Sequence, residues 1–111
     1  MTIIDWQTAL RGPGAMDLSS FLITACTVED RRRWEPDLID RYVGGLRAGG
    51  VVIDAGWLAR SYDENVLWWM GQFASNLARL EPDDAEARAS LDTMVERTFT
   101  AGADRSVGRL L

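Results

Sequence analysis

Apolar residues recur at intervals of three and four in four stretches of this chain, and that spacing places them on one face of an α-helix. The longest pattern predicts a helix that begins after a possible N-cap at Asp54 and runs to about Leu80. Its stripe consists of Leu58, Tyr62, Val66, Trp69, Phe73, Leu77 and Leu80. Because Trp57, Trp68 and Met70 widen this stripe, we expect the helix to be covered on more than one side.

Two elements are expected before this helix, ahead of residue 27. The β-branched run Thr2-Ile3-Ile4 is typical of a strand end, and the turn Arg11-Gly12-Pro13-Gly14 follows it. A helix then begins near Asp17, whose carboxylate can accept backbone N–H groups at the positive end of the helix dipole. Its apolar face consists of Leu18, Phe21, Leu22, Ala25 and Cys26.

Prolines bound the other two predicted helices. Thr27 is a possible N-cap, but Pro36 lacks the amide hydrogen that a continuous helix needs. We therefore expect a short first turn and then a main helix over residues 36–48. A last helix is expected near residues 83–100, and the glycine-containing tail from Ala101 is predicted to fray.

Four helices after one strand end make the predicted fold class mainly α. A lone strand leaves its backbone N–H and C=O groups without partners, so the strand end at residues 2–4 needs a neighbour from elsewhere. The sequence thus predicts that residues 1–111 form a single partial domain of a larger fold.

Composition excludes several classes of site. The 111 residues include no histidine, and all twelve basic residues are arginine. A P-loop and a Schiff-base enzyme need lysine, and Ser-His-Asp and Cys-His sites need histidine. Cys26 is the single cysteine, so a structural zinc site and a disulfide within the chain are excluded. Its place on an apolar helix face predicts a buried, inert thiol.

The charge pattern bears on partners. Seventeen acidic against twelve basic residues give a net charge of −5, and acids flank the only basic run, Arg31-Arg32-Arg33. An acidic chain is a poor ligand for nucleic acid. No apolar run approaches a membrane span, and the start of the chain lacks the basic region of a signal peptide. We expect a cytoplasmic protein that binds neither nucleic acid nor membrane.

Asp5 is the strongest candidate for chemistry. It follows the short apolar strand and precedes an aromatic residue and a loop. A carboxylate in that position can hold Mg²⁺ against the phosphates of a nucleotide. An aspartate that only caps the following turn fits the same three residues, and it is the commoner case.

A wider pattern surrounds Asp5. The segments Ile3-Ile4-Asp5-Trp6-Gln7, Arg11-Gly12-Pro13-Gly14 and Asp17-Leu18-Ser19-Ser20-Phe21-Leu22 follow one another at short spacing. This series resembles the C-terminal lobe of the aminoglycoside phosphotransferase and ecdysteroid kinase-like family. The resemblance is sharp over residues 3–22, looser to about residue 62, and helical in character afterwards.

The resemblance implies an ATP-dependent small-molecule kinase with a protein-kinase-like fold, of which this chain is a four-helix C-terminal subdomain. Asp5 would be its metal-binding aspartate, holding Mg²⁺ through the nucleotide phosphates, and the acceptor would be a small molecule with a hydroxyl group. Asp17, Gly12 and Gly14 would support the active site structurally.

The family's catalytic loop, with a His-Gly-Asp-like start and a later asparagine, has no counterpart in this sequence, and neither has the phosphate-binding lysine. We therefore expect Mg²⁺ and ATP to bind in the complete family fold and not to this chain alone. No catalytic residue is assigned within the chain, and its C-terminal fragment character predicts that it is inactive by itself. The implied partner is a missing N-terminal kinase portion.

Two alternatives remain open. One is a non-catalytic helical interaction or oligomerisation module, which would self-associate through the apolar arc at residues 66–73. The other is a stand-alone enzyme that uses Asp83 and Asp84, although adjacent acids are ordinary at a helix start. Four tryptophans, Trp34, Trp57, Trp68 and Trp69, have the helical spacing of core or interface residues and could also line a ligand pocket.

Overall fold

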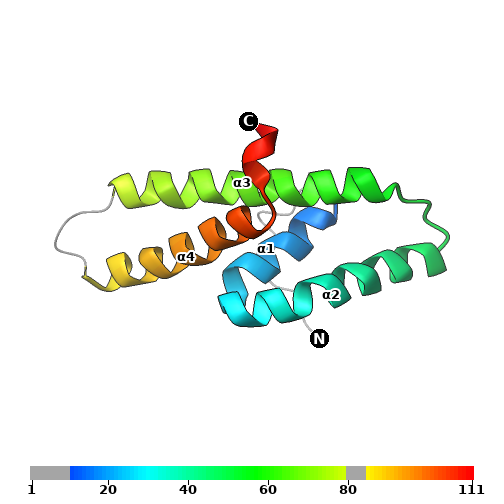
Figure 1. Cartoon of the computed structure of the whole chain (residues 1–111), viewed down its shortest axis with the longest axis horizontal. Coiled ribbons are helices and arrows are strands. Elements are labelled where there is room, and N and C mark those ends of the chain that lie inside the picture. Colours follow the sequence, from blue (N-terminus) through cyan, green and yellow to red (C-terminus); the bar gives the residue numbers. More distant parts are fainter. Residues whose placement is uncertain (1–10, 80–84) are drawn as a thin grey trace.

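The computed structural model describes residues 11–79 and 85–111, and this part of the chain is almost entirely helical (Figure 1). Four α-helices and one short 3-10 helix follow in order: α1 (Ala15–Ala25), α2 (Val28–Ala48), α3 (Ala55–Arg79), α4 (Ala85–Asp104) and η2 (Val107–Leu110). The described residues include no strand, and the strand end predicted at residues 2–4 lies outside them. The predicted mainly α class is confirmed.

The long helix α3 organises the fold. Figure 1 shows it along the long axis of the molecule, with α4, α1 and α2 on one side of it and η2 rising past it at the C-terminus. It packs most extensively against α4 and α1. The core consists of Ala15, Leu22, Ile23, Cys26, Leu58, Tyr62, Val66, Ala101 and Val107.

Two predicted helix starts are confirmed by their caps. The backbone N–H of Asp30 donates to Thr27 Oγ1 at 3.1 Å, and the Thr27 hydroxyl donates to Asp30 Oδ2 at 2.9 Å. At α3, the backbone N–H of Trp57 donates to Asp54 Oδ1 at 2.6 Å. Each side chain satisfies an amide hydrogen that the first helical turn leaves without a partner.

The break predicted at Pro36 is wrong, because α2 is continuous over Val28–Ala48 with Pro36 inside it. Proline removes one backbone hydrogen bond, the one that would reach the carbonyl of Arg32. Arg32 and Pro36 both lie on the exposed side of the helix, so water can solvate that carbonyl. A neighbouring side of the helix carries Arg31 and Glu35, which are buried and hold the helix against the rest of the protein through Asp104 and Tyr62.

The prediction that the tail from Ala101 frays is also wrong. Helix α4 continues to Asp104, Ala101 and Gly102 are buried in it, and Val107 of η2 joins the core. Ser106 turns the chain between the two helices with a positive φ of 52°. A Cβ atom on Gly102 would lie 2.5 Å from Met70 Sδ and 3.3 Å from Val107 Cγ2, so the missing side chain lets α4 approach α3 closely.

The apolar arc at residues 66–73 packs mostly within the chain. Val66 and Phe73 are buried, and the ring of Trp69 stacks on that of Phe73 with centroids 5.1 Å apart. The indole N–H of Trp69 donates to Ser20 Oγ of α1 at 2.9 Å. Trp68 is 53% exposed and Trp57 is 50% exposed, so these two residues lie outside the covered face. Self-association through this arc stays a prediction.

No helix among residues 11–79 and 85–111 is long and apolar enough to cross a membrane.

Substituting Gly102→Leu should lower the free energy of unfolding by about 1–3 kcal/mol, because the new side chain must displace Met70 and Val107. Gly71→Leu is the matched control: Gly71 is exposed on α3 with nothing within 4 Å of an added Cβ. Replacing a helical glycine there should stabilise the protein by about 0.5–1 kcal/mol. Urea titration followed by circular dichroism measures both, and equal effects of the two variants would contradict the close packing of α4 on α3.

Candidate functional site

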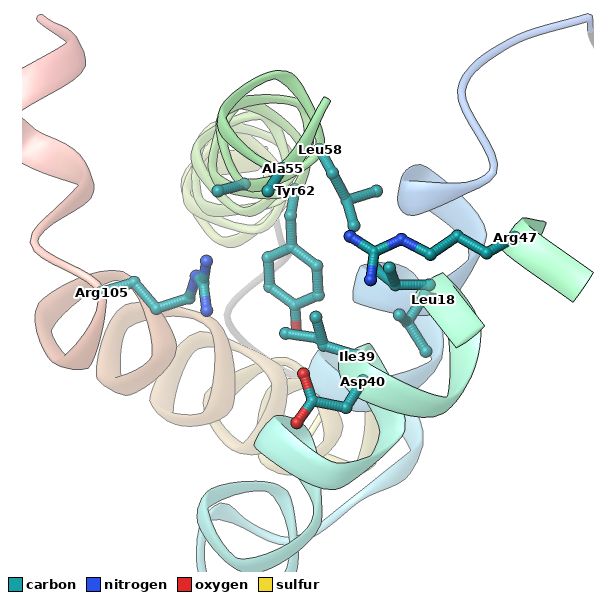
Figure 2. Close-up of a pocket in the computed structure, with 10 residues that line it drawn as sticks. Leu18, Ile39, Asp40, Arg47, Ala55, Leu58, Tyr62 and Arg105 are labelled. Atoms are coloured by element: carbon teal, nitrogen blue, oxygen red, sulfur yellow. The ribbon is translucent and has the colours of Figure 1, made fainter. Parts of the chain in front are cut away.

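A cavity of about 230 Å³ lies between α1, α2 and α3, beside the end of α4 (Figure 2). Its wall is largely apolar, and three charged side chains stand among the apolar ones. The lining consists of Leu18, Ile39, Asp40, Val43, Arg47, Ala55, Leu58, Ala59, Tyr62 and Arg105.

The helical repeat explains why these residues meet. On α2, positions 39, 43 and 47 are four residues apart, and on α3 positions 55, 58, 59 and 62 follow the same periodicity. Each set therefore lies along one helix face, and the two faces line the cavity from different sides. Alanines at positions 55 and 59 leave room that longer side chains would fill.

Arg47 and Asp40 are the free charges of the lining. Both side chains are exposed, and neither forms a hydrogen bond or ion pair with the residues that the structure describes. Figure 2 shows the Arg47 side chain extending from α2 across the cavity toward Leu58 and Tyr62. Asp40 lies at a different part of the lining, beside Ile39.

Tyr62 and Arg105 connect the cavity to a group of paired charges, here called the ion cluster, of which Arg31, Glu35 and Asp63 are buried. It consists of Arg31, Arg32, Glu35, Asp63, Asp104, Arg105 and Arg109. Arg31 pairs with Glu35 at 3.0 Å along α2, and the Tyr62 hydroxyl donates to Glu35 at 2.6 Å. The guanidinium of Arg105 lies 4.3 Å from the centre of the Tyr62 ring, within the range of a cation–π contact.

Asp63 is the most deeply placed acid of the ion cluster. It is 1% exposed, and its two carboxylate oxygens accept hydrogen bonds from Arg105 and Arg109. At the other side of the cluster, Asp104 accepts from Arg31 and from Arg32, the latter at 2.8 and 3.0 Å. The cluster thus joins α2 and α3 to the C-terminal end of the chain.

Proton affinities in the cluster follow from these contacts. Burial and the hydrogen bond to Glu35 raise the pKa of Tyr62 well above its usual range, so its hydroxyl stays a neutral donor. The hydrogen bond from Arg32 and the neighbouring Arg31 lower the pKa of Asp104 to about 2, although partial desolvation opposes them. Burial raises the pKa of the Cys26 thiol, in line with the inert thiol expected at that position.

The residues predicted from the sequence occupy other positions. Asp5, together with Asp83 and Asp84, lies outside the described residues. Asp17 is exposed in the first turn of α1, which begins at Ala15, two residues earlier than expected. Gly12 is exposed, and neither Asp17 nor Gly12 lines the cavity.

Close packing explains why residue 14 is a glycine. It is the N-cap of α1, and a Cβ atom on it would collide with the hydroxyl of Tyr42 on α2. The absence of a side chain therefore lets Tyr42 cover the start of α1.

The sequence reasoning missed the acids of the ion cluster, yet a signal for them exists. Glu35 precedes the apolar positions 38 and 39 of α2 by three and four residues, and Asp63 lies beside Tyr62 and three before Val66. An acid within a buried helix face needs partners there, so such positions indicate buried ion pairs. Which arginines supply them depends on tertiary contacts. No group of three or more potential metal ligands occurs among residues 11–79 and 85–111.

A protein-family model described as uncharacterized oxidoreductase dhs-27 (DUF1679) matches residues 1–46. That family is related to the ecdysteroid and aminoglycoside kinase-like proteins. The matched range includes Asp5, all of α1 and α2 up to Leu46, and thus the whole of residues 3–22, where the resemblance is sharp. No curated protein and no solved structure matches the chain.

Asp63→Asn should lower the free energy of unfolding by about 3 kcal/mol, because it leaves Arg105 and Arg109 without their shared buried carboxylate. Its neighbour offers a control: Glu64 is exposed and pairs with Arg60 one turn away on the same helix. Glu64→Gln should cost only about 0.3–0.5 kcal/mol. Denaturant titration measures both, and a small loss for Asp63→Asn would show that the cluster contributes little to stability.

Asp104 should give the protein an acid-sensitive component of stability. Its pKa is lowered in the folded state to about 2, so the stabilisation is present above the ordinary value of about 4 and is lost as the pH falls toward 2. Asp104→Asn should be less stable than the parent at pH 7 and should lose less stability between pH 4 and pH 2. Thermal unfolding across that interval tests this, and parallel pH profiles for the two proteins would refute it.

Proposed function

We propose that this chain forms the helical C-terminal portion of an ATP-dependent small-molecule kinase that phosphorylates a hydroxyl group. The observation that carries the proposal is the family match over residues 1–46, in a family related to kinase-like proteins. That range contains the Asp5 element and the two helices from which Leu18, Ile39 and Val43 line the cavity.

In this proposal Asp5 holds Mg²⁺ against the phosphates of ATP. Phosphoryl transfer depends on positioning and on neutralising the charge of the transferred group, and the metal ion supplies much of that neutralisation. Residues that the resemblance implies elsewhere in the complete fold, a catalytic aspartate, an asparagine and a lysine, complete the nucleotide site. The 111 residues alone are therefore inactive.

The cavity between α1, α2 and α3 provides the place for the acceptor. A phosphoryl acceptor must be held within a few tenths of an ångström of its reacting geometry, which calls for rigid walls. The ion cluster supplies such rigidity, because Tyr62 lines the cavity and at the same time donates to the buried Glu35. Arg105, another lining residue, is held by Asp63.

A chimaera tests the proposal. Residues 1–111 would replace the corresponding C-terminal portion of an aminoglycoside phosphotransferase, and phosphate release from Mg·ATP would be measured with and without a panel of hydroxyl compounds. We expect ATP turnover by the chimaera and none by the 111-residue chain. Asp5→Asn should lower kcat of the chimaera about 100-fold or more, because the metal loses its carboxylate ligand.

Asp37→Asn is the control, since Asp37 is an exposed α2 acid that pairs with Arg41 at 3.0 Å. It should leave kcat within about twofold of the parent chimaera, as expected for a surface pair. A folded chimaera without ATP turnover, or one in which Asp5→Asn turns over as fast as the parent, would refute the proposed function.

A further inference from the structure

We infer that the cavity binds a small organic monoanion with an apolar body, such as a medium-chain carboxylate, and that Arg47 receives its charged group. If the chain is part of a kinase as proposed above, the acceptor is a member of this class that also carries a hydroxyl group, and in that role the inference rests on the proposed function. Binding itself follows from the cavity and does not require phosphoryl transfer.

The apolar wall selects the body of the ligand. Leu58 and Tyr62 are buried, and Leu18, Ile39 and Val43 are partly buried around the same space. The cavity of about 230 Å³ is smaller than the roughly 300–1,000 Å³ of drug-sized sites. A small ligand with a short apolar chain buries its surface against carbon atoms there.

Arg47 selects the charge of the ligand. Its guanidinium reaches across the cavity and has no acid to pair with among the described residues (Figure 2). Asp40 is seven residues away on α2, which is a rise of about 10 Å along a helix, so the two charges do not neutralise each other at contact. A carboxylate matches the planar donors of a guanidinium with two parallel hydrogen bonds.

The third charged residue of the lining is already engaged. Arg105 donates to Asp63 and lies on the Tyr62 ring, 4.3 Å from its centre. It therefore occupies a ring face that an organic cation would need for a cation–π contact. Since the charge of Arg105 is balanced by Asp63, Arg47 is the arginine of the lining that is left to receive an anion.

A second, partly apolar hollow adjoins the cavity at Arg47. This shallower hollow shares Arg47 with the cavity and is lined by Gly50, Val51, Val52 and Ile53. Val52 is fully exposed and Val51 is about half exposed, on the loop between α2 and α3. Arg47 thus stands between an apolar interior and an apolar rim, an arrangement that suits a ligand with one charged group and carbon on either side of it.

Three probes of equal length test the inference on the 111-residue chain: octanoate, octylammonium and 1-octanol, each titrated by calorimetry and by amide chemical-shift changes. Octanoate should bind with a Kd at least tenfold lower than the other two. Arg47→Gln should raise the Kd of octanoate five- to tenfold and leave that of octanol unchanged. Arg60→Gln is the control on an exposed α3 arginine that pairs with Glu64, and it should change nothing.

Filling the cavity gives a second, independent readout. Ala59→Trp should abolish octanoate binding, and Ala59→Leu should weaken it if the tryptophan variant fails to fold, as judged by circular dichroism. The inference is overturned if folded protein does not bind octanoate at millimolar concentration, if the three probes bind equally, or if Arg47→Gln or the filled variant binds octanoate like the parent.

These outcomes are separable from those of the kinase test. Octanoate binding by a chain whose chimaera shows no ATP turnover would leave the ligand class standing and remove its role as acceptor. ATP turnover by the chimaera without any preference for anionic probes would support the proposed kinase function and overturn the ligand class.

Discussion

The carboxylate of Asp63 sets the constraint on which the rest of the structure depends. A charge that is 1% exposed must be neutralised by groups inside the protein, since an unpaired buried ion costs several kcal/mol. The chain meets this requirement with Arg105 and Arg109, which come from its last seven residues. The end of α4 and η2 are thereby held against the middle of α3.

Buried charges that need partners also hold α2 in place. Glu35 is buried with Arg31 one turn before it, and it accepts from Tyr62 on α3, while Arg31 reaches Asp104 at the end of α4. Three helices are thus linked by charges and hydrogen bonds as well as by apolar packing. The wall of the cavity formed by Tyr62 and Arg105 takes its rigidity from this network.

Local sequence signals predicted most of the fold. The three- and four-residue spacing located all four helices, and the capping residues Thr27 and Asp54 placed two helix starts within one residue. The errors arise where distant contacts decide. Pro36 is tolerated because its helix is anchored by the buried Arg31 and Glu35 on a neighbouring face, and the tail is held by Asp63, about forty residues earlier in the chain. Neither effect is visible within a window of one helix.

For the candidate site too, part could be predicted from local sequence and part depends on tertiary packing. The stripes of α2 and α3 that line the cavity are readable from periodicity, but the space between them depends on how the helices pack and on the small Ala55 and Ala59. Asp5 was found by motif, and its role as a metal ligand stays a prediction.

The buried thiol of Cys26 can report local opening of the fold. It is the single sulfhydryl of the chain, and it is buried at the corner where α1 ends and the chain turns into α2. Its reaction with an alkylating reagent requires that corner to open, since the thiol is covered in the native state. The rate at which Cys26 is alkylated therefore reports how often the junction between α1 and α2 opens. Mass spectrometry can measure this rate on the unmodified protein.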